Sequence, residues 1–471
     1  FLALIGIIVW VVRQKQNDSA DYFLGGRDAT WLAIGASIFA SNIGSEHLIG
    51  LAGAGASSGM AMAHWEIQGW MILILGWVFV PFYTRSMVYT MPEFLERRYN
   101  PQSRTILSVI SLVSYVLTKV AVTVYAGGLV FQQVFGIKEL WGIDFFWIAA
   151  IGLVVLTALY TIFGGMKSVL YTSVLQTPIL LLGSLIILVL GFKELGGWDE
   201  MMRVCGAVTV NDYGDTMTNL IRSNDDANFP WLGALIGSAI IGFWYWCTDQ
   251  FIVQRVLSGK NEMEARRGTI FGAYLKLLPV FLFLIPGMIA FALHQKYIGA
   301  GGEGFLPMLE NGTANADAAF PTLVAKLLPA GVKGLVVCGI LAALMSSLAS
   351  LFNSSAMLFT IDFYKRFRPE TPEKKLVGIG QVATVVIVIL GILWIPIMRS
   401  VGDVLYTYLQ DVQSVLAPGI AAAFLLGICW KRTSAQGGMW GLIAGMVIGL
   451  TRLGAKVYYS NAGEVADSTF K

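Results

Sequence analysis

Charged residues are scarce in this chain, at 13% of 471 residues, against about 25% in an average soluble domain. Hydrophobic residues reach 56%, and the mean hydropathy is +0.69. This composition excludes a string of soluble domains and indicates an all-α integral membrane protein that crosses the bilayer many times. The formal net charge of +3 is too small to indicate a nucleic-acid partner.

Cysteine and histidine are also few, with four and three residues. The cysteines, Cys205, Cys247, Cys338 and Cys429, lie far apart and form no CxxC pair, which excludes a disulfide framework and a zinc site. No nucleophile–base–orienter set and no cofactor motif occurs, so we do not expect an enzyme. Nothing in the sequence indicates an obligatory protein partner.

Apolar runs near 20 residues long dominate what is present, and about twelve of them fit the thickness of a bilayer. The predicted spans are 1–12, 29–52, 60–84, 105–136, 144–163, 167–192, 231–256, 268–294, 319–361, 376–398, 403–429 and 436–456. We interpret 1–12 as the end of a further span and not as a signal peptide. The hydrophilic stretches 193–230 and 295–318 are expected outside the bilayer.

More than half of the 32 basic residues fall in alternate short loops on one side of these spans. The positive-inside rule makes that side cytoplasmic, so residue 1 is expected on the outer side of a plasma or bacterial inner membrane.

The second span is interrupted by the polar segment Ser41–His47. Non-helical backbone at membrane depth is tolerated only where it lines a cavity or is buried in protein, and transporters build binding sites from such broken helices. A loop between two short helices of a soluble protein is the alternative, and the composition disfavours it.

Charged residues also occur within spans. Glu66 and Lys276 would be tolerated if they were paired or bound a polar ligand. Lys276 has a second interpretation, in which its side chain snorkels to the nearby cytoplasmic loop. Lys119 lies midway along its span, and the sequence suggests no partner for it.

A run of small residues, 341–350, contains the adjacent hydroxyls Ser346 and Ser347. Such serines often serve close helix packing alone. Carbonyls released at the Ala40–Ile43 break, together with these hydroxyls, would also form a shell of oxygen ligands for Na⁺.

Aromatic and polar residues meet again in 242–250, which either binds a sugar ring or belongs to an interfacial aromatic belt. Further along, Tyr406 and Gln410 are four residues apart and share one helical face.

Taken in order, these segments resemble the sodium/solute symporter family, and within it the sodium/glucose cotransporter branch, over about residues 21–452. The matching segments are Ala40–Ser45, Met91–Phe94, Trp244–Gln250, Gly272–Leu277, Pro286–Ile289, Leu341–Asn353 and Pro418–Ala422. The resemblance implies a LeuT-like fold, with a core of two inverted five-helix repeats and extra flanking helices. The implied divisions are an extra helix and loop (1–28), the first repeat (29–192), an outer loop (193–230), the second repeat (231–429), and a last helix with a tail (430–471).

The resemblance also implies the site residues. The substrate would be surrounded by Asn42, His47, Glu66, Tyr245, Trp246, Lys276 and Gln410. The gates would be Leu51, Trp65 and Tyr406 on the outer side and Tyr245 on the inner side. The coupling ion, Na⁺, would be bound by the carbonyls of Ala40, Ile43 and Ala343 and the hydroxyls of Ser346 and Ser347.

Three departures from the family pattern carry information. Carriers of a second sodium tend to have Asp where this chain has Ser173 and Thr where it has Ala349, so one Na⁺ per substrate is expected. Thr407 stands where sugar carriers often have Asp, which leaves the outer-gate contacts open.

The expected function is therefore Na⁺-coupled symport of a neutral hexose such as glucose or galactose. An acidic substrate is disfavoured by Glu66, and a cation gains nothing from Lys276, whereas a neutral polyol suits both. Symport of Na⁺ with myo-inositol or another polyol is accordingly the second predicted function. A sodium-gated sugar sensor or channel is the alternative from a different class of protein.

Overall fold

The structure, a computed structural model, describes residues 2–14, 16, 18–44, 46–226, 228–309, 312–401 and 405–461. In 2–5, 397–401, 405–411 and 456–461 the backbone alone is described. The chain is mostly helical (81%), which confirms the predicted all-α class. Short 3₁₀ or π turns within or between helices carry the label η.

The elements of the first part of the chain, in order, are α1 (Leu2–Val12), α2 (Ser19–Leu24), η1 (Gly25–Arg27), α3 (Trp31–Asn42), η2 (Glu46–Leu51), α4 (Ala52–Ser58), η3 (Gly59–Met62), α5 (Ala63–Ile67), η4 (Gln68–Trp70), α6 (Met71–Ile74), η5 (Leu75–Phe79), α7 (Val80–Ser86), α8 (Met91–Arg98), α9 (Pro101–Ser114), η6 (Tyr115–Val120), α10 (Ala121–Phe135), β1 (Glu139–Leu140), β2 (Ile143–Asp144) and α11 (Phe145–Leu195). The two strands pair antiparallel as a short hairpin.

The elements of the second part are α12 (Trp198–Gly206), α13 (Trp231–Gly242), η7 (Phe243–Thr248), α14 (Gln250–Leu257), α15 (Glu262–Leu275), η8 (Val280–Leu284), α16 (Ile285–Gly299), η9 (Ala316–Ala318), α17 (Ala319–Leu327), α18 (Ala330–Met357), η10 (Leu358–Tyr364), α19 (Lys365–Phe367), α20 (Glu373–Val401), α21 (Leu405–Cys429) and α22 (Ala435–Asn461).

Within the described residues, nine continuous helical stretches are long and apolar enough to cross a membrane, and Trp31–Asn42 is a shorter apolar helix. The predicted number was about twelve, and one difference lies in α11. At about 1.5 Å per residue, its 51 residues would extend far beyond a bilayer core of roughly 30 Å. Gly165 interrupts it with a φ of 52° and a ψ of −149°, so α11 joins the two predicted spans 144–163 and 167–192 at a kink.

Two helices break where the sequence places polar groups. α3 ends at Asn42, Ile43 is extended, with φ −79° and ψ 103°, and helical structure resumes at Glu46. The second break lies between η7 and α14, where Asp249 has φ −74° and ψ 127°. The side chain of Asp249 caps the new helix by accepting a hydrogen bond from the backbone N–H of Phe251.

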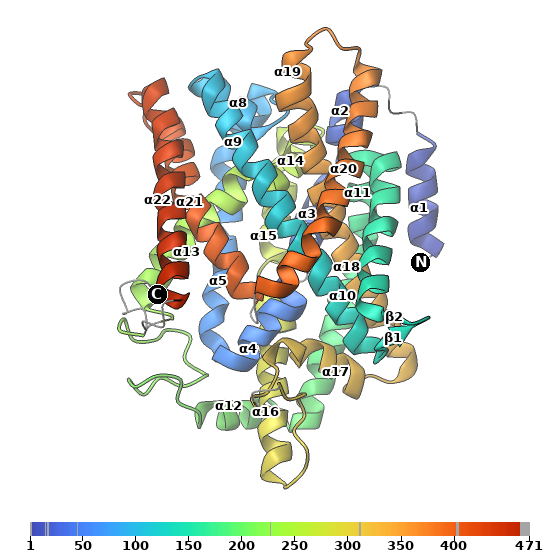
Figure 1. The fold of residues 1–471 in the computed structure, drawn as a ribbon, viewed down its shortest axis with the longest axis vertical. Coiled ribbons are helices and arrows are strands. Elements are labelled where there is room, and N and C mark those ends of the chain that lie inside the picture. The colour runs from blue at the N-terminus through green and yellow to red at the C-terminus, as the bar shows by residue number, and fades with distance from the viewer. Residues whose placement is uncertain are drawn as a thin grey trace.

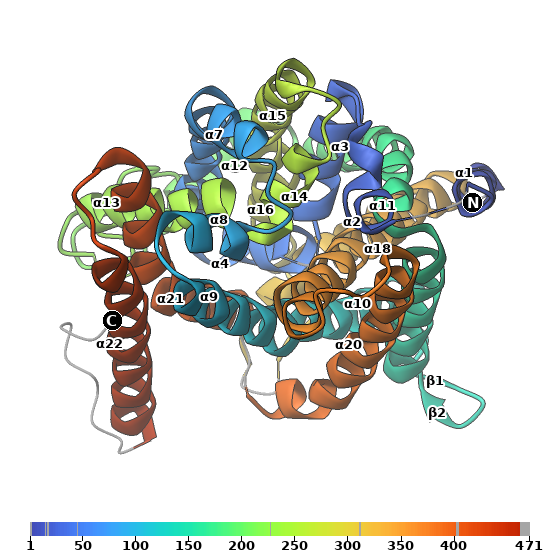
Figure 2. The ribbon, with the colours of Figure 1, turned by 90° about the horizontal axis from the view of Figure 1, so that it is seen from above.

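Helix α3 packs closely against α15, and the two lie side by side in both views (Figures 1 and 2). A Cβ added to Gly35 would lie 2.7 Å from the carbonyl oxygen of Gly268, so the two backbones approach as closely as small residues permit. In both views α13, α21 and α22 lie together on one side, and α1 lies on the opposite side.

The two ends of the helix bundle differ. Elements α8 and α19 reach the upper end in Figure 1, α12 and α16 reach the lower end, and the β1–β2 hairpin projects at the side in the lower half. The upper end carries the loops that are rich in Lys and Arg, and we keep it as the predicted cytoplasmic side.

Candidate functional site

The two helix breaks face a small central cavity of about 30 Å³, roughly the room of one or two water molecules. Its lining residues are Asn42, Glu46, His47, Trp65, Glu66, Gln68, Tyr245, Trp246, Lys276 and Gln413. Six of the seven predicted substrate residues are therefore brought together. The seventh, Gln410, and the predicted outer-gate residue Tyr406 have side chains outside the described part of the chain.

Three of these side chains form a buried charged cluster. Lys276 Nζ lies 2.6 Å from Glu66 Oε2 and 2.7 Å from His47 Nε2, and His47 Nε2 lies 3.2 Å from Glu66 Oε1. The snorkelling interpretation of Lys276 is wrong, because its side chain is only 3% exposed and turns toward the carboxylate. An ion pair of this kind stays in the membrane interior only where each charge has a partner.

Several polar atoms of the residues that line the cavity have no hydrogen-bond partner among the described residues. Asn42 Oδ1 and Gln68 Oε1 are acceptors, and Trp246 Nε1 is a donor. His47 Nδ1 is also unpartnered. Buried polar atoms are normally satisfied, so a convergent set of unpaired donors and acceptors is the feature expected of a binding site for a polar ligand.

Tyr245 closes one wall of the cavity. Its hydroxyl accepts a hydrogen bond from Asn42 Nδ2 at 2.9 Å, and its ring makes an edge contact with Trp246 at 4.9 Å. Tyr245 and Trp246 are 7% and 2% exposed. The interfacial-belt interpretation is therefore wrong for these rings, which belong to the protein interior.

The predicted outer gate is represented by two described side chains. Trp65 lines the central cavity. Leu51, the last residue of η2, is fully buried and is not among the lining residues. Its assignment as a gate stays a prediction.

The predicted sodium ligands lie around the break in α3. Ser347 Oγ donates to the carbonyl of Ser41 at 2.8 Å and lies 3.4 Å from the carbonyl of Ile43, so a hydroxyl and two carbonyl oxygens converge there. Ser41 lies within the predicted Ala40–Ile43 break, although the ligands implied by the family resemblance did not include it. Ser346 points elsewhere, with its Oγ 3.2 Å from Ser173 Oγ. The remaining predicted ligands, Ala40 and Ala343, are buried.

The serines beside this cluster contact a buried arginine. Arg255 Nε donates to Ser37 Oγ at 3.2 Å and to Ser41 Oγ at 3.0 Å, and Ser173 Oγ is 3.4 Å from Ser37 Oγ. Ala349 is fully buried and offers no oxygen from its side chain. Such surroundings, with a fixed cation nearby and no carboxylate at Ser173, are poor for a second sodium.

Lys119 has a partner that the sequence did not suggest. Its ammonium lies 2.7 Å from Asp249 Oδ2, and the two side chains are 3% and 2% exposed. The partners are 130 positions apart, and no local pattern connects them.

Three lining residues were missed by the sequence reasoning. Glu46 is part of the interrupted segment beside His47, and that position was the available signal. Gln413 lies three residues after Gln410, so both fall on nearly the same helical face, and the structure shows Gln413 at the cavity. Gln68 follows Glu66 by two residues, a spacing that predicts no shared face.

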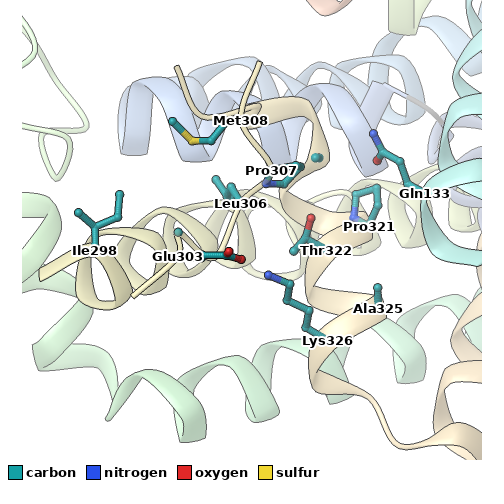
Figure 3. A pocket seen from close by; sticks show the side chains of 12 residues that line it. Gln133, Ile298, Glu303, Leu306, Pro307, Met308, Pro321, Thr322, Ala325 and Lys326 are labelled. Carbon is teal, nitrogen blue, oxygen red and sulfur yellow. The ribbon is translucent and has the colours of Figure 1, made fainter. Parts of the chain in front are cut away.

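A larger cavity of about 630 Å³ lies at the opposite end from α8 and α19, between the end of α16, the segment after it and α17 (Figure 3). Glu303 and Lys326 point toward each other across it. Both side chains are exposed, and Lys326 already donates to the carbonyl of Phe305 at 2.7 Å. None of the described residues that line this cavity has a buried polar atom without a partner, so the central cavity remains the candidate substrate site.

A family model described as "Sodium:solute symporter family" matches residues 22–445. The chain is 38% identical over 467 residues to "Sodium/myo-inositol cotransporter 2" of Homo sapiens, with 96% of this chain and 68% of that protein covered. It is also 38% identical over 477 residues to "Sodium/myo-inositol cotransporter" of Homo sapiens, with 96% and 66% covered. These relatives are cotransporters, in agreement with the prediction that the chain is not an enzyme.

Solved structures agree on the fold. A substrate-bound, outward-open Na⁺-coupled sialic acid symporter aligns with a TM-score of 0.78 at 22% identity, covering 96% of each chain. MhsT in complex with L-phenylalanine aligns with a TM-score of 0.58 at 13% identity, covering 90% of this chain and 96% of that one. The predicted LeuT-like fold is thereby confirmed.

Proposed function

The chain belongs to the sodium:solute symporter family and is a Na⁺-coupled symporter, and we propose that its substrate is a neutral polyol. The first candidate is myo-inositol, and the second is a hexose. The sequence alone favours a hexose as the transported substrate. The two named relatives favour the alternative, since both carry myo-inositol in their names.

The observation that carries the proposal is the set of unpaired donors and acceptors around the central cavity. Each hydroxyl of a polyol both donates and accepts, so one ring with several hydroxyls can satisfy Asn42 Oδ1, Gln68 Oε1 and Trp246 Nε1 together. Tyr245 and Trp246 supply aromatic faces for the C–H surface of the ring.

The charges select for a neutral substrate. Glu66 would repel a carboxylate, and Lys276 would repel an ammonium, while their mutual contact leaves the pair with no formal net charge. A hydroxyl can insert beside such a pair by accepting from Lys276 and donating to Glu66.

Transport requires the site to widen, because about 30 Å³ holds no ring of this size. Binding would separate contacts of the Lys276–Glu66–His47 cluster and replace them with contacts to hydroxyls. Opening toward the inside would move Tyr245, and opening toward the outside would move Trp65, with Leu51 and Tyr406 as the further outer-gate residues. The transporter would alternate between these two openings.

Coupling to Na⁺ is built into the broken helix α3–η2. The proposed ion ligands Ala40 and Ile43 and the substrate residues Asn42 and His47 lie on the same short segment. An ion that binds the released carbonyls fixes the position of that segment and so favours substrate binding, and the linkage is reciprocal. With Ser173 and Ala349 in place, we propose one Na⁺ per substrate.

The remaining assignments complete the proposal. The proposed repeats are 29–192 and 231–429, and the protein resides in the plasma or inner membrane as a multi-pass carrier of a small molecule and Na⁺. The outer side is proposed for the start of α1, and residue 1, for which it was predicted, lies outside the described residues.

Uptake of labelled myo-inositol into proteoliposomes, with a sodium or a choline gradient, tests the function. We expect Na⁺-driven accumulation above the external concentration, with unlabelled myo-inositol competing better than glucose or galactose. Stronger competition by glucose would assign a hexose. Equilibration without accumulation would contradict symport and favour a channel or sensor.

A further inference from the structure

The buried ion pair between Lys119 and Asp249 lies at the break of the second interrupted helix. The two oxygens of Asp249 have different roles. Oδ1 accepts hydrogen bonds from the backbone N–H of Phe251, which caps α14, and from the hydroxyl of Tyr115. Oδ2 lies 2.7 Å from Lys119 Nζ. Capping of α14 needs only Oδ1 of Asp249. The contact of Oδ2 with Lys119 therefore joins α14 to η6, the element that carries Lys119.

The same ammonium faces aromatic rings. It lies 4.5 Å from the ring centre of Tyr245, 4.9 Å from that of Phe251 and 5.1 Å from that of Tyr115. A cation at these distances is attracted to the face of each ring, and the attraction is larger where water is absent. Of the three rings, Tyr245 has the shortest distance to Lys119.

Tyr245 borders two cavities, as do Asn42 and Glu46. It lines the central cavity, and it also lines a second one of about 10 Å³. The second cavity is bounded by Ser347 of the proposed sodium site and by Lys119. Movement of the Tyr245 ring would therefore connect the substrate site with the space beside the ion ligands.

We propose that Lys119 is a positioning residue for the inner gate: held by Asp249, it keeps the ring of Tyr245 over the substrate cavity and so prevents passage of substrate without sodium. This inference rests on the proposed function, in which Tyr245 is the inner gate. It adds a residue that the sequence left without a role.

The geometry explains why a charge is needed at this place. Besides its ring contacts with neighbouring aromatic side chains, Tyr245 has two polar contacts, the hydrogen bond from Asn42 Nδ2 to its hydroxyl and the ammonium of Lys119 at its ring. The first comes from the helix that binds substrate and ion, and the second comes from η6. Asp249 follows Tyr245 by four residues and lies at the break between η7 and α14. The ion pair between Lys119 and Asp249 therefore holds both the gate residue and the break in position.

The other charged groups nearby are Glu46, which lines the small cavity with Lys119, and Arg255, whose guanidinium carbon lies 4.9 Å from the ring centre of Phe251. Among the described residues Asp249 is the carboxylate in ion-pair contact with Lys119, while Glu46 is a second carboxylate at the same cavity and Arg255 is a second cation.

The test compares variants in proteoliposomes by two measurements, the affinity for myo-inositol and the downhill uptake of labelled myo-inositol without sodium. Lys119→Met removes the charge and keeps the length of the side chain, and Lys119→Arg keeps a cation. Lys326→Met is the matched control, because it removes another ammonium that lies over an aromatic ring, 4.9 Å from the centre of Phe305, far from the gate.

We expect Lys119→Met to raise sodium-independent uptake at least about tenfold, which corresponds to about 1.4 kcal/mol, with the affinity changed less than about threefold. Lys119→Arg restores low leakage, and Lys326→Met leaks no more than the unmodified protein. A merely structural role would instead lower folding, affinity and transport together, and it would not open a leak.

A second variant keeps the proposal testable if Lys119→Met does not fold. The double change Lys119→Met with Asp249→Asn removes both buried charges, which is tolerated far better than leaving one unpaired, and it retains an oxygen for the α14 cap. It should leak in the same way. Normal sodium-dependent transport without a leak in the folded variants would overturn the proposal. Absence of sodium-dependent uptake by the unmodified protein would instead count against the proposed function.

Discussion

At the central cavity, Glu66 serves two nitrogen-bearing side chains at once, Lys276 and His47. Substrate must compete with these internal contacts, so part of its binding energy is spent in separating them. Removing Glu66 would also leave Lys276 buried and unpaired, at a cost to folding of several kcal/mol. Neutral side chains at the cavity are therefore better probes of substrate contacts.

Gln413 is such a probe, since it is 7% exposed and lines the cavity without carrying charge. We predict that Gln413→Ala weakens myo-inositol binding at least about tenfold, because a hydroxyl left unpaired in a dry site costs about 1–3 kcal/mol. Isothermal titration at saturating sodium measures the change. Gln410→Ala is the companion variant. Weaker binding in Gln410→Ala together with unchanged binding in Gln413→Ala would show that Gln410, the residue predicted from the sequence, contacts the substrate.

Ser347 is the side chain whose contacts agree best with the predicted sodium site, since its hydroxyl reaches the carbonyls of Ser41 and Ile43. Ser347→Ala is expected to raise the sodium concentration for half-maximal transport at least about tenfold and to weaken substrate binding at fixed sodium, as reciprocal linkage requires. Sodium titrations of uptake and of binding check both effects. Unchanged sodium dependence in a folded variant would remove Ser347 from the ion site.

The sequence predicted individual cavity residues well where a break or a charge within an apolar span marked them, as with His47, Glu66 and Lys276. It could not predict partners far apart in the chain. The contact of Lys119 with Asp249 depends on how two helices cross, and hydropathy carries no information on that. Gln68 was missed for a related reason, since its direction depends on the short turn η4 within an irregular helix.

Among the elements, the contact of α3 with α15 positions the break that carries the site. We predict that Gly35→Ala lowers thermal stability, because its Cβ would lie 2.7 Å from the backbone oxygen of Gly268, and the helices would have to separate. Overpacking of this kind costs about 1–3 kcal/mol. Gly152→Ala is the matched control, since a Cβ there meets nothing within 4 Å. Equal melting temperatures for the two variants would show that the close approach is not needed.

The outer element η9 gives a prediction on pH. Burial raises the pKa of Asp317 to about 6, and its Oδ1 would lie 2.6 Å from a Cβ added to Gly53 of α4. An unfolded Asp has a pKa of about 3.9, so between about pH 4 and pH 6 the folded protein binds more protons, and its stability falls as the pH rises through this window. Asp317→Asn removes that cost. It should raise the melting temperature at pH 7.5 and have little effect at pH 4 or below, and an equal effect at both values would show that ionisation of the buried carboxyl does not lower stability.

Element boundaries were predicted closely where an apolar run was long, and less well where runs join. The spans 144–163 and 167–192 were assigned from their apolar lengths alone, and they meet at Gly165 in one helical element, because Gly165 turns the chain without a loop. The reverse occurs at 29–52, where a single predicted span is divided between α3, η2 and α4. The polar residues of Ser41–His47 signalled that division.

At the scale of the whole molecule, the charges near the site are formally balanced. The cations and carboxylates concerned are Lys119, Arg255, Lys276, Glu46, Glu66 and Asp249. One bound Na⁺ adds a single positive charge to this interior, and the oxygens around Ser347 and Ile43 can receive it. A second Na⁺ would add another charge close to Arg255 without any new carboxylate, which is unfavourable in a dry interior.

We therefore predict that one Na⁺ moves with each substrate. One inward charge gains about 2.3 kcal/mol per 100 mV, so a single ion limits accumulation to roughly the sodium ratio multiplied by about 50-fold per 100 mV. Two ions would square that limit. The reversal potential of the substrate-induced current, measured against the sodium gradient, gives the ratio. A ratio near two would show that other oxygens replace the carboxylate missing at Ser173, and Ser173→Ala would then be expected to lower it, because Ser173 Oγ already lies 3.2 Å from Ser346 Oγ.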